Sequence, residues 1–187
     1  MNGTNKRILA LDTFLCLKVN NLTGKKFIDK TSYIISRLGD GSIYFIFLAL
    51  FILFFNKPAF ITSRDYLSAG ALNGLFYKLV KNKVKRERPF IKLANINKIM
   101  PPPDEFSFPS GHSGAAAVFC YCTFYHMPIY VGVISFVWML LVGFSRVYNG
   151  VHYPGDVLVG FLMGSLTAKM LIYVFNTDFI INLASLL

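Results

Sequence analysis

Charged side chains are scarce in this chain, and acidic ones are scarcer still. Asp, Glu, Lys and Arg together make up 15% of the 187 residues, whereas average soluble domains carry about 25%. Hydrophobic residues make up 55%, and the mean hydropathy is +0.52. This composition argues against an ordinary soluble domain and favours a single membrane-embedded domain over residues 1–187.

Cysteine is too sparse for a disulfide framework or a zinc site. The chain has three cysteines, Cys16, Cys120 and Cys122, all in apolar segments. Cys120 and Cys122 are two residues apart, so on a helix they do not face each other. We therefore expect three buried structural thiols.

A cleavable signal peptide is not expected, because Asp12 interrupts the apolar segment 8–17 and no clean cleavage site follows it. Nine Asp and Glu stand against nineteen Lys and Arg, which gives a net charge of +10. Such a charge favours anionic partners, either nucleic acid or anionic lipid. The long apolar segments favour lipid, so we expect a membrane and no nucleic acid.

The apolar segments predict an all-α fold, a polytopic membrane bundle of about five transmembrane helices after an N-terminal interfacial segment. Over residues 1–41, apolar residues recur at helical spacing among charged ones, which is typical of amphipathic helices in the membrane surface. The expected spans cover residues 42–55, 65–80, 110–126, 129–144 and 156–175. The first is short for a hydrocarbon core about 30 Å thick, and Asn56-Lys57-Pro58 is expected to end it.

This assignment brings three polar motifs to one membrane face. The basic loop 81–109 follows the second span, and the loop 145–153 follows the fourth. The third span begins at Ser110. Pro154-Gly155 opens the fifth, which begins at Asp156. Because consecutive spans alternate in direction, both loops and both helix starts lie on the same side. The sequence therefore predicts one site, roofed by loops, at one surface of the membrane.

The first two motifs are suited to binding an anion. Ser110 is a good N-cap, and the free N–H groups and dipole of the helix that it begins attract negative charge. Lys81, Arg88 and Arg146 can bind phosphate oxygens. Two plainer interpretations stay open: an ordinary serine-capped membrane helix, and basic residues that are solvated or contact lipid headgroups. For Lys83, Lys85 and Arg86 we favour the latter, solvated basic residues that bind lipid headgroups.

The third motif can supply a nucleophile. His152 and Asp156 are four residues apart across Pro154. A carboxylate one turn away can keep one imidazole nitrogen protonated and leave the other free to attack. His112 could then act as a general acid. His126 lies at the opposite end of its span, and we expect an interfacial side chain there.

Together the motifs resemble those of the type 2 phosphatidic acid phosphatase superfamily, with no departure from its pattern. They are Lys81-x6-Arg88-Pro89, Pro109-Ser110-Gly111-His112 and Ser145-Arg146-x5-His152-x3-Asp156. The resemblance implies that His152 is a nucleophile that forms a phosphohistidine, that Asp156 orients it, and that His112 protonates the leaving group. The implied phosphate-binding residues are Lys81, Arg88, Ser110, Gly111 and Arg146. The resemblance also implies a reaction without metal or cofactor.

The resemblance implies an integral-membrane lipid phosphatase that hydrolyses a phosphate monoester or diphosphate. Phosphatidylglycerol phosphate, phosphatidate, undecaprenyl diphosphate and lipid A 1-phosphate are all open as substrates. The alternatives are a lipid phosphotransferase with the same intermediate and a non-catalytic protein that binds anionic lipid. A vanadium haloperoxidase has a related anion site but fits five spans poorly.

The resemblance also implies a bacterial inner membrane with the site on its periplasmic face. The distribution of positive charge favours a cytoplasmic site instead, since only Lys57, Arg64 and Lys169 are assigned to the other face. We follow the resemblance.

Overall fold

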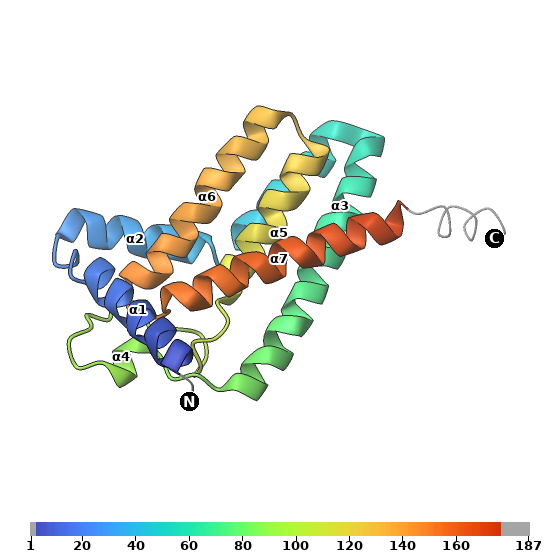
Figure 1. Cartoon of the computed structure of the whole chain (residues 1–187). Coiled ribbons are helices and arrows are strands. Elements are labelled where there is room, and N and C mark those ends of the chain that lie inside the picture. The colour runs from blue at the N-terminus through green and yellow to red at the C-terminus, as the bar shows by residue number, and fades with distance from the viewer. Residues whose placement is uncertain (1–2, 177–187) are drawn as a thin grey trace.

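The computed structural model describes residues 3–176, apart from the side chains of residues 3–5, 42, 52 and 54–59. Within this part the chain forms seven helices and no strand, so the all-α class is confirmed (Figure 1). In chain order they are α1 (Gly3–Asn20), α2 (Lys26–Leu38), α3 (Ser42–Val84), α4 (Pro89–Lys92), α5 (Gly111–His126), α6 (Ile129–Tyr148) and α7 (Pro154–Phe175).

The starts of α5 and α7 follow from local sequence. The Ser110 Oγ accepts hydrogen bonds from the Ser113 N–H at 3.4 Å and from the Ser113 hydroxyl at 2.8 Å. Pro154 occupies the first turn of α7, where the missing N–H of proline removes no helical hydrogen bond. Asp156 Oδ2 accepts from the Tyr153 N–H at 2.9 Å. The predicted start at Ser110 is confirmed, and the start predicted at Asp156 lies two residues too late.

The C-terminal end of α6 extends past its predicted end at residue 144, through Tyr148. The Ser145 Oγ donates to the Val142 carbonyl at 2.7 Å. The positive charge of Arg146 also suits the last turn of a helix, whose free carbonyls carry partial negative charge. Ser145 and Arg146 therefore lie on a rigid helix rather than in the expected loop 145–153.

The long helix α3 replaces two predicted spans. The predicted end at Asn56-Lys57-Pro58 is wrong, because the helix runs from Ser42 to Val84. Its ribbon nevertheless changes direction: in Figure 1 a cyan arm and a green arm of α3 meet in a bend at the top of the view. A proline removes one backbone donor, so it can kink a helix without ending it.

The helices α6 and α7 are long and apolar enough to cross a membrane. The pair formed by α2 and residues 43–51 of α3, bent by 56°, would make a third span among the described residues. The outer face of α7 is suited to lipid, since Leu158, Leu162 and Leu166 recur every four residues and are 61%, 63% and 63% exposed. The count of five spans stays a prediction.

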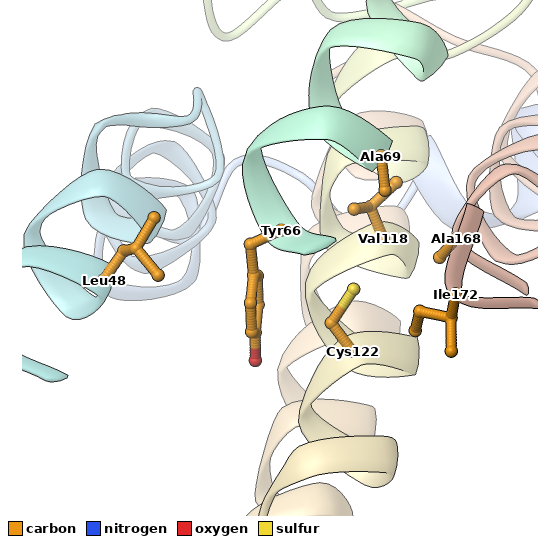
Figure 2. Close-up of a cluster of buried hydrophobic side chains, with 7 residues drawn as sticks. All are labelled: Leu48, Tyr66, Ala69, Val118, Cys122, Ala168 and Ile172. Carbon is orange, nitrogen blue, oxygen red and sulfur yellow. The ribbon is translucent and has the colours of Figure 1, made fainter. Parts of the chain in front are cut away.

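The central helix of the bundle is α5, which packs against α3, α6 and α7. A Cβ at Gly160 of α7 would lie 2.5 Å from the Ser110 carbonyl oxygen, so glycine permits this close approach. The starts of α5 and α7 are thereby joined, and the Ser110 N–H donates to the Asp156 carbonyl at 3.0 Å. A buried cluster lies between α3, α5 and α7 (Figure 2): Leu48, Tyr66, Ala69, Val118, Cys122, Ala168 and Ile172.

The three cysteines are buried free thiols, as predicted. His126 at the far end of α5 differs from its prediction as an interfacial side chain. Its Nε2 lies 3.0 Å from Oδ2 of the fully buried Asp65, and Arg64 holds the other oxygen of that carboxylate at 2.7 Å. A buried carboxylate requires such partners, which explains why His126 turns inward.

The N-terminal helices α1 and α2 lie beside the ends of α6 and α7 (Figure 1). The helix α2 is amphipathic, with Ser32 and Ser36 buried and Phe27 and Ile34 exposed. Its exposed apolar face is compatible with the interfacial role expected for residues 1–41, and that role stays a prediction.

Candidate active site

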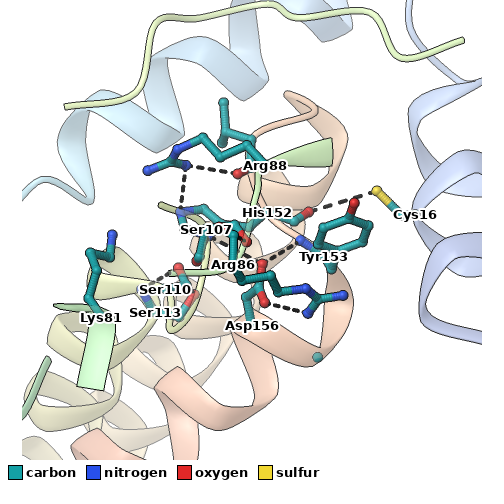
Figure 3. A network of polar contacts seen from close by, with 12 residues as sticks. Cys16, Lys81, Arg86, Arg88, Ser107, Ser110, Ser113, His152, Tyr153 and Asp156 are labelled. Atoms are coloured by element: carbon teal, nitrogen blue, oxygen red, sulfur yellow. Dashed lines mark hydrogen bonds and ion pairs between the residues drawn. The ribbon is translucent and has the colours of Figure 1, made fainter. Parts of the chain in front are cut away.

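The three sequence motifs converge at one end of the bundle (Figure 3). The second and third motifs meet through the Ser110–Asp156 main-chain hydrogen bond at 3.0 Å. The first and third meet where Arg88 Nη1 lies 3.4 Å from His152 Nε2 and 2.8 Å from the Val151 carbonyl. The predicted convergence of the end of α3, the starts of α5 and α7, and the end of α6 is therefore confirmed.

The His152 side chain is buried, with 2% of its surface exposed. Its Nδ1 lies 2.6 Å from the main-chain carbonyl of Ser107, which can only accept, so Nδ1 carries the proton. Burial, followed by the charges of Arg146 and Arg88, lowers the pKa of His152 well below its ordinary value. The ring is therefore neutral, and its Nε2 lone pair points toward the Arg88 guanidinium.

Asp156 does not make the hydrogen bond to His152 that the sequence predicted. Its Oδ2 is 3.7 Å from His152 Nδ1, which is too long for a hydrogen bond and short enough for electrostatic stabilisation of a charged ring. The same Oδ2 accepts from the Tyr153 N–H at 2.9 Å, and Oδ1 accepts from Arg86 Nη1 at 2.6 Å. Asp156 caps its own helix, and the Ser107 carbonyl takes the place expected for it.

Two of the predicted phosphate-binding cations share one carboxylate. Lys81 Nζ and Arg88 Nη2 each lie 2.6 Å from Asp104 Oδ1, and the Tyr77 hydroxyl donates to Oδ2. Burial opposes ionisation of Asp104, but the hydrogen bonds from Lys81 and Tyr77 outweigh it and lower its pKa to about 2. Asp104 was not among the predicted site residues, although an acidic residue is informative in a chain that has only nine.

The third cation, Arg146, is fully buried at the end of α6. Its Nη1 contacts the Ser36 hydroxyl and lies 3.4 Å from the Met100 sulfur. Its Nε and Nη2 have no hydrogen-bond partner in the part of the chain that the structure describes. A buried guanidinium with two unpaired donor atoms is costly, and an anion held beside it would remove that cost.

The N-terminus of α5 supplies the remaining predicted residues. Ser110 is buried and acts as the N-cap, and Gly111 begins the helix. A Cβ at Gly111 would lie 2.8 Å from the Tyr77 ring. Glycine is therefore favoured here by packing, in addition to the space that it would leave for a phosphate. His112 lies one residue further on, and its Nε2 is 3.2 Å from Asp40 Oδ1, an exposed carboxylate.

Arg86 and Ser107 are further site residues that sequence reasoning missed. Arg86 was expected to be solvated together with Lys83 and Lys85. The two lysines are exposed, as expected, whereas Arg86 pairs with Asp156 and Asp12 at 2.6 Å each. Ser107 acts through its main chain, which no pattern of side chains reveals.

The fold and site together define an integral membrane protein, all-helical over residues 3–176, with a cluster of buried cationic side chains at one end of the bundle. The chain belongs to the PAP2 superfamily, whose sequence profile matches residues 62–180, and this confirms the resemblance seen in the motifs. All three motifs lie inside the matched segment.

Several known proteins resemble the chain. It is 31% identical to an undecaprenyl-diphosphatase from Sulfolobus acidocaldarius over 90 residues, which are 48% of this chain and 44% of that protein. The crystal structure of Aquifex aeolicus LpxE superposes with a TM-score of 0.74 at 26% identity, covering 83% of this chain and 91% of that one. A transmembrane PAP2-type phosphatidylglycerolphosphate phosphatase from Bacillus subtilis gives a TM-score of 0.70 at 27% identity, covering 88% and 84%. The chain spans about half the length of the curated relatives it matches first.

Proposed function

We propose that the protein is a metal-independent lipid phosphatase that works through a phosphohistidine intermediate. The observation that carries the proposal is the fully buried Arg146, whose Nε and Nη2 have no partner among residues 3–176. A phosphate group beside it would accept from these donors and would also contact Arg88, next to His152. The relatives named as an undecaprenyl-diphosphatase and as a transmembrane phosphatidylglycerolphosphate phosphatase support a lipid phosphate as the ligand.

The first step of the proposed reaction is attack by His152 Nε2 on phosphorus. A phosphorus–nitrogen bond forms as the bond to the lipid oxygen breaks, and His112 gives its proton to the departing alkoxide. Lys81, Arg88, Arg146 and the N–H groups at the start of α5 would stabilise the charge on the transferring oxygens. The phosphorylated ring carries a positive charge, which Asp156 at 3.7 Å can stabilise.

The second step is hydrolysis of the phosphohistidine. His112, now neutral, takes a proton from water, and the hydroxide oxygen attacks phosphorus as the phosphorus–nitrogen bond breaks. Inorganic phosphate leaves, and His152 returns to its neutral form with the proton still on Nδ1. His112 must be protonated at the start of each cycle, and the negative charge of the bound phosphate favours that state. The exposed Asp40 carboxylate, 3.2 Å from His112 Nε2, favours it further.

An apolar groove of about 430 Å³ beside the site supports a lipid substrate. It lies between α3 and α5, and its lining includes Tyr44, Leu48 and Phe119. Its lining includes Gly41, next to Asp40, and Ala115, three residues after His112, so one end of the groove lies near the proposed acid. A hydrocarbon chain in this groove would leave its headgroup near the cations. Phosphatidylglycerol phosphate, phosphatidate, undecaprenyl diphosphate and lipid A 1-phosphate all satisfy this requirement.

The direct test is phosphate release by purified protein in detergent, with these four lipids assayed side by side. We expect turnover that resists chelators, is inhibited by vanadate and disappears in His152→Ala. The phosphohistidine should be trapped from radiolabelled lipid as an acid-labile, alkali-stable adduct. Turnover by His152→Ala at the rate of a Glu105→Gln control, which changes only an exposed acid of the same loop, would remove the proposed nucleophile.

Two alternatives give different outcomes in the same assay. A phosphotransferase would move the phosphoryl group to an added alcohol and release little inorganic phosphate. A non-catalytic binder would retain lipid in equilibrium binding without turnover.

The proposed topology has five spans, with the two arms of α3, then α5, α6 and α7 crossing a bacterial inner membrane. The site would then open to the periplasm. A Glu105→Cys substitution in a cysteine-free background places one exposed thiol in the site loop. Labelling by an impermeant thiol reagent in intact cells supports the periplasmic orientation, and labelling only after lysis overturns it.

A further inference from the structure

Arg86 lies between two carboxylates at the site, those of Asp156 and Asp12. Figure 3 shows its contact with Asp156. Its Nη1 is 2.6 Å from Asp156 Oδ1, and its Nη2 is 2.6 Å from Asp12 Oδ2. The guanidinium also covers the Tyr153 ring, with its central carbon 3.8 Å from the ring centroid. Asp156 is fully buried and Arg86 and Asp12 are mostly buried, so these pairs are poorly screened by water.

The main chain of Arg86 holds the other group that faces His152. The Arg86 carbonyl accepts from the Ser107 N–H at 2.8 Å and from its hydroxyl at 3.2 Å. The Ser107 carbonyl in turn accepts from His152 Nδ1 at 2.6 Å. Arg86 therefore contacts both residues that face Nδ1, Asp156 through its side chain and Ser107 through its main chain.

Asp12 connects this arrangement to the N-terminal helix α1. Its Oδ2 binds Arg86, and its Oδ1 accepts from the Gly155 N–H at 2.7 Å, one residue before Asp156. Asp12 thus contacts both the start of α7 and the arginine that holds Asp156. The outer side of α1 is apolar, with Leu11 and Phe14 more than half exposed.

We propose that Arg86 is a positioning residue for the nucleophile His152, and that Asp12 makes this positioning depend on the docking of α1. The inference rests on the proposed function and deepens it. Arg86 touches neither His152 nor the transferring phosphate, and it acts through Ser107 and Asp156. Without its guanidinium, the Asp156 carboxylate would lose its charged partner, and the main chain of Arg86, which holds Ser107, would lose its tie to the start of α7.

The kinetic test is Arg86→Gln in the full-length protein, with Lys83→Gln as the matched control in the same basic segment. Displacement of a nucleophile by about 1 Å can cost roughly 10²-fold in rate. We expect kcat of Arg86→Gln to fall by that order with little change in KM, and kcat of Lys83→Gln to stay at the wild-type level. Arg86→Lys keeps the positive charge but loses the planar guanidinium that binds both carboxylates. Its kcat should therefore lie between those of Arg86→Gln and wild type.

The role of Asp12 is tested by a double-mutant cycle. Asp12→Asn should lower kcat less than Arg86→Gln, and the double variant should fall no further than Arg86→Gln alone. Additive losses would show that Asp12 acts independently of Arg86 and would overturn the proposed link to α1.

A second readout separates positioning from a structural role. The charged or titratable groups around His152 are Lys81, Arg88, His112, Arg146 and Asp156. Removing the Arg86 charge leaves Asp156 uncompensated 3.7 Å from His152 Nδ1, so the histidine should protonate at higher pH. Histidine NMR of the purified protein in detergent measures this directly, and it does not require turnover. It therefore tests the inference even if the wild type hydrolyses none of the lipids, which would refute the proposed function alone.

The inference is overturned by either of two results. One is an Arg86→Gln enzyme with the kcat of Lys83→Gln. The other is a folded Arg86→Gln protein with reduced kcat but a His152 titration identical to wild type, since a structural role predicts no change in that titration.

Discussion

The main-chain carbonyl of Ser107 lies 2.6 Å from Nδ1 of His152 and accepts its hydrogen bond. A carbonyl oxygen cannot donate, so this contact fixes the neutral ring with its proton on Nδ1 and its lone pair on Nε2, the atom proposed to attack phosphorus. Asp156 is 3.7 Å away and acts on the ring through its charge. In this protein, therefore, one residue sets the tautomer of His152, and another would stabilise the positive charge of the proposed phosphohistidine.

The division of roles predicts a moderate effect of Asp156→Asn. The amide oxygen can still accept from the Tyr153 N–H, and the Ser107 carbonyl still sets the tautomer. We expect kcat to fall by about 10²-fold, less than the roughly 10⁴-fold loss in a triad whose carboxylate sets the tautomer. Steady-state phosphate release measures this, with Glu105→Gln as the control. A loss as large as that in the triad would show that Asp156, not Ser107, determines the state of the ring.

Replacing Asp104 is predicted to strengthen the binding of a phosphate mimic, whereas replacing Asp156 is predicted to lower activity. Its carboxylate holds Lys81 and Arg88 in place, but it also neutralises charge that phosphate would use. With a pKa of about 2, Asp104 is ionised at every working pH, so the competition is always present. Asp104→Asn should therefore bind vanadate about tenfold more tightly, which corresponds to about 1.4 kcal/mol.

The control for Asp104→Asn is Glu105→Gln, which removes the same charge from the neighbouring exposed residue. Long-range electrostatics alone would give both variants the same inhibition constant for vanadate. Weaker binding by Asp104→Asn would mean that the carboxylate serves mainly to position the two cations.

The low pKa of His152 predicts its behaviour in acid. Burial and the charges of Arg146 and Arg88 disfavour the protonated ring, so His152 should stay neutral as the pH falls through about 6.5, where an ordinary histidine titrates. Arg88→Gln removes one of these charges, so the pKa of His152 should rise. Histidine NMR of the phosphate-free protein checks both statements. The His126→Asn variant identifies the signal of His126. A wild-type His152 that titrates near 6.5 would contradict the buried, cationic environment.

The sequence predicted the structure correctly where the identity of one or two neighbouring residues determines where a helix begins. Ser110 as an N-cap and Pro154 in the first turn of α7 place two helix starts within two residues. Alternation of direction then brings the motifs to one surface. The same reasoning failed in α3, because Pro58 signals a change of direction without deciding whether the helical hydrogen bonds continue.

The parts of the site that escaped prediction depend on contacts between distant segments. Arg86 and Lys85 are adjacent and chemically similar. Within the described chain, however, only Arg86 pairs with carboxylates, one 70 and the other 74 residues away. Asp156 was expected beside His152 from its spacing alone, but spacing could not show that Arg86 and the Tyr153 N–H would bind it first. Ser107 contributes a carbonyl, which every residue has.

Arg146 carries the proposed function and gives its sharpest test. The buried guanidinium has two donor atoms without partners in the described chain, so in the absence of anion it should lower stability. Arg146→Met should therefore leave the melting temperature of the anion-free protein equal to or above that of wild type. Loss of a contact to a charged group costs about 1.5–3 kcal/mol, so vanadate affinity should fall by at least about tenfold.

The two effects of Arg146→Met can be read in one experiment, thermal unfolding in detergent with and without vanadate. A ligand that binds only the folded state at about 100 times its Kd stabilises it by about 2.7 kcal/mol. Wild type and Arg37→Gln, an exposed arginine of α2, should both melt higher when vanadate is added. Arg146→Met should not respond at the same concentration. A variant that unfolds earlier without anion yet retains the full response to vanadate would mean that Arg146 supports the fold and that the phosphate lies elsewhere.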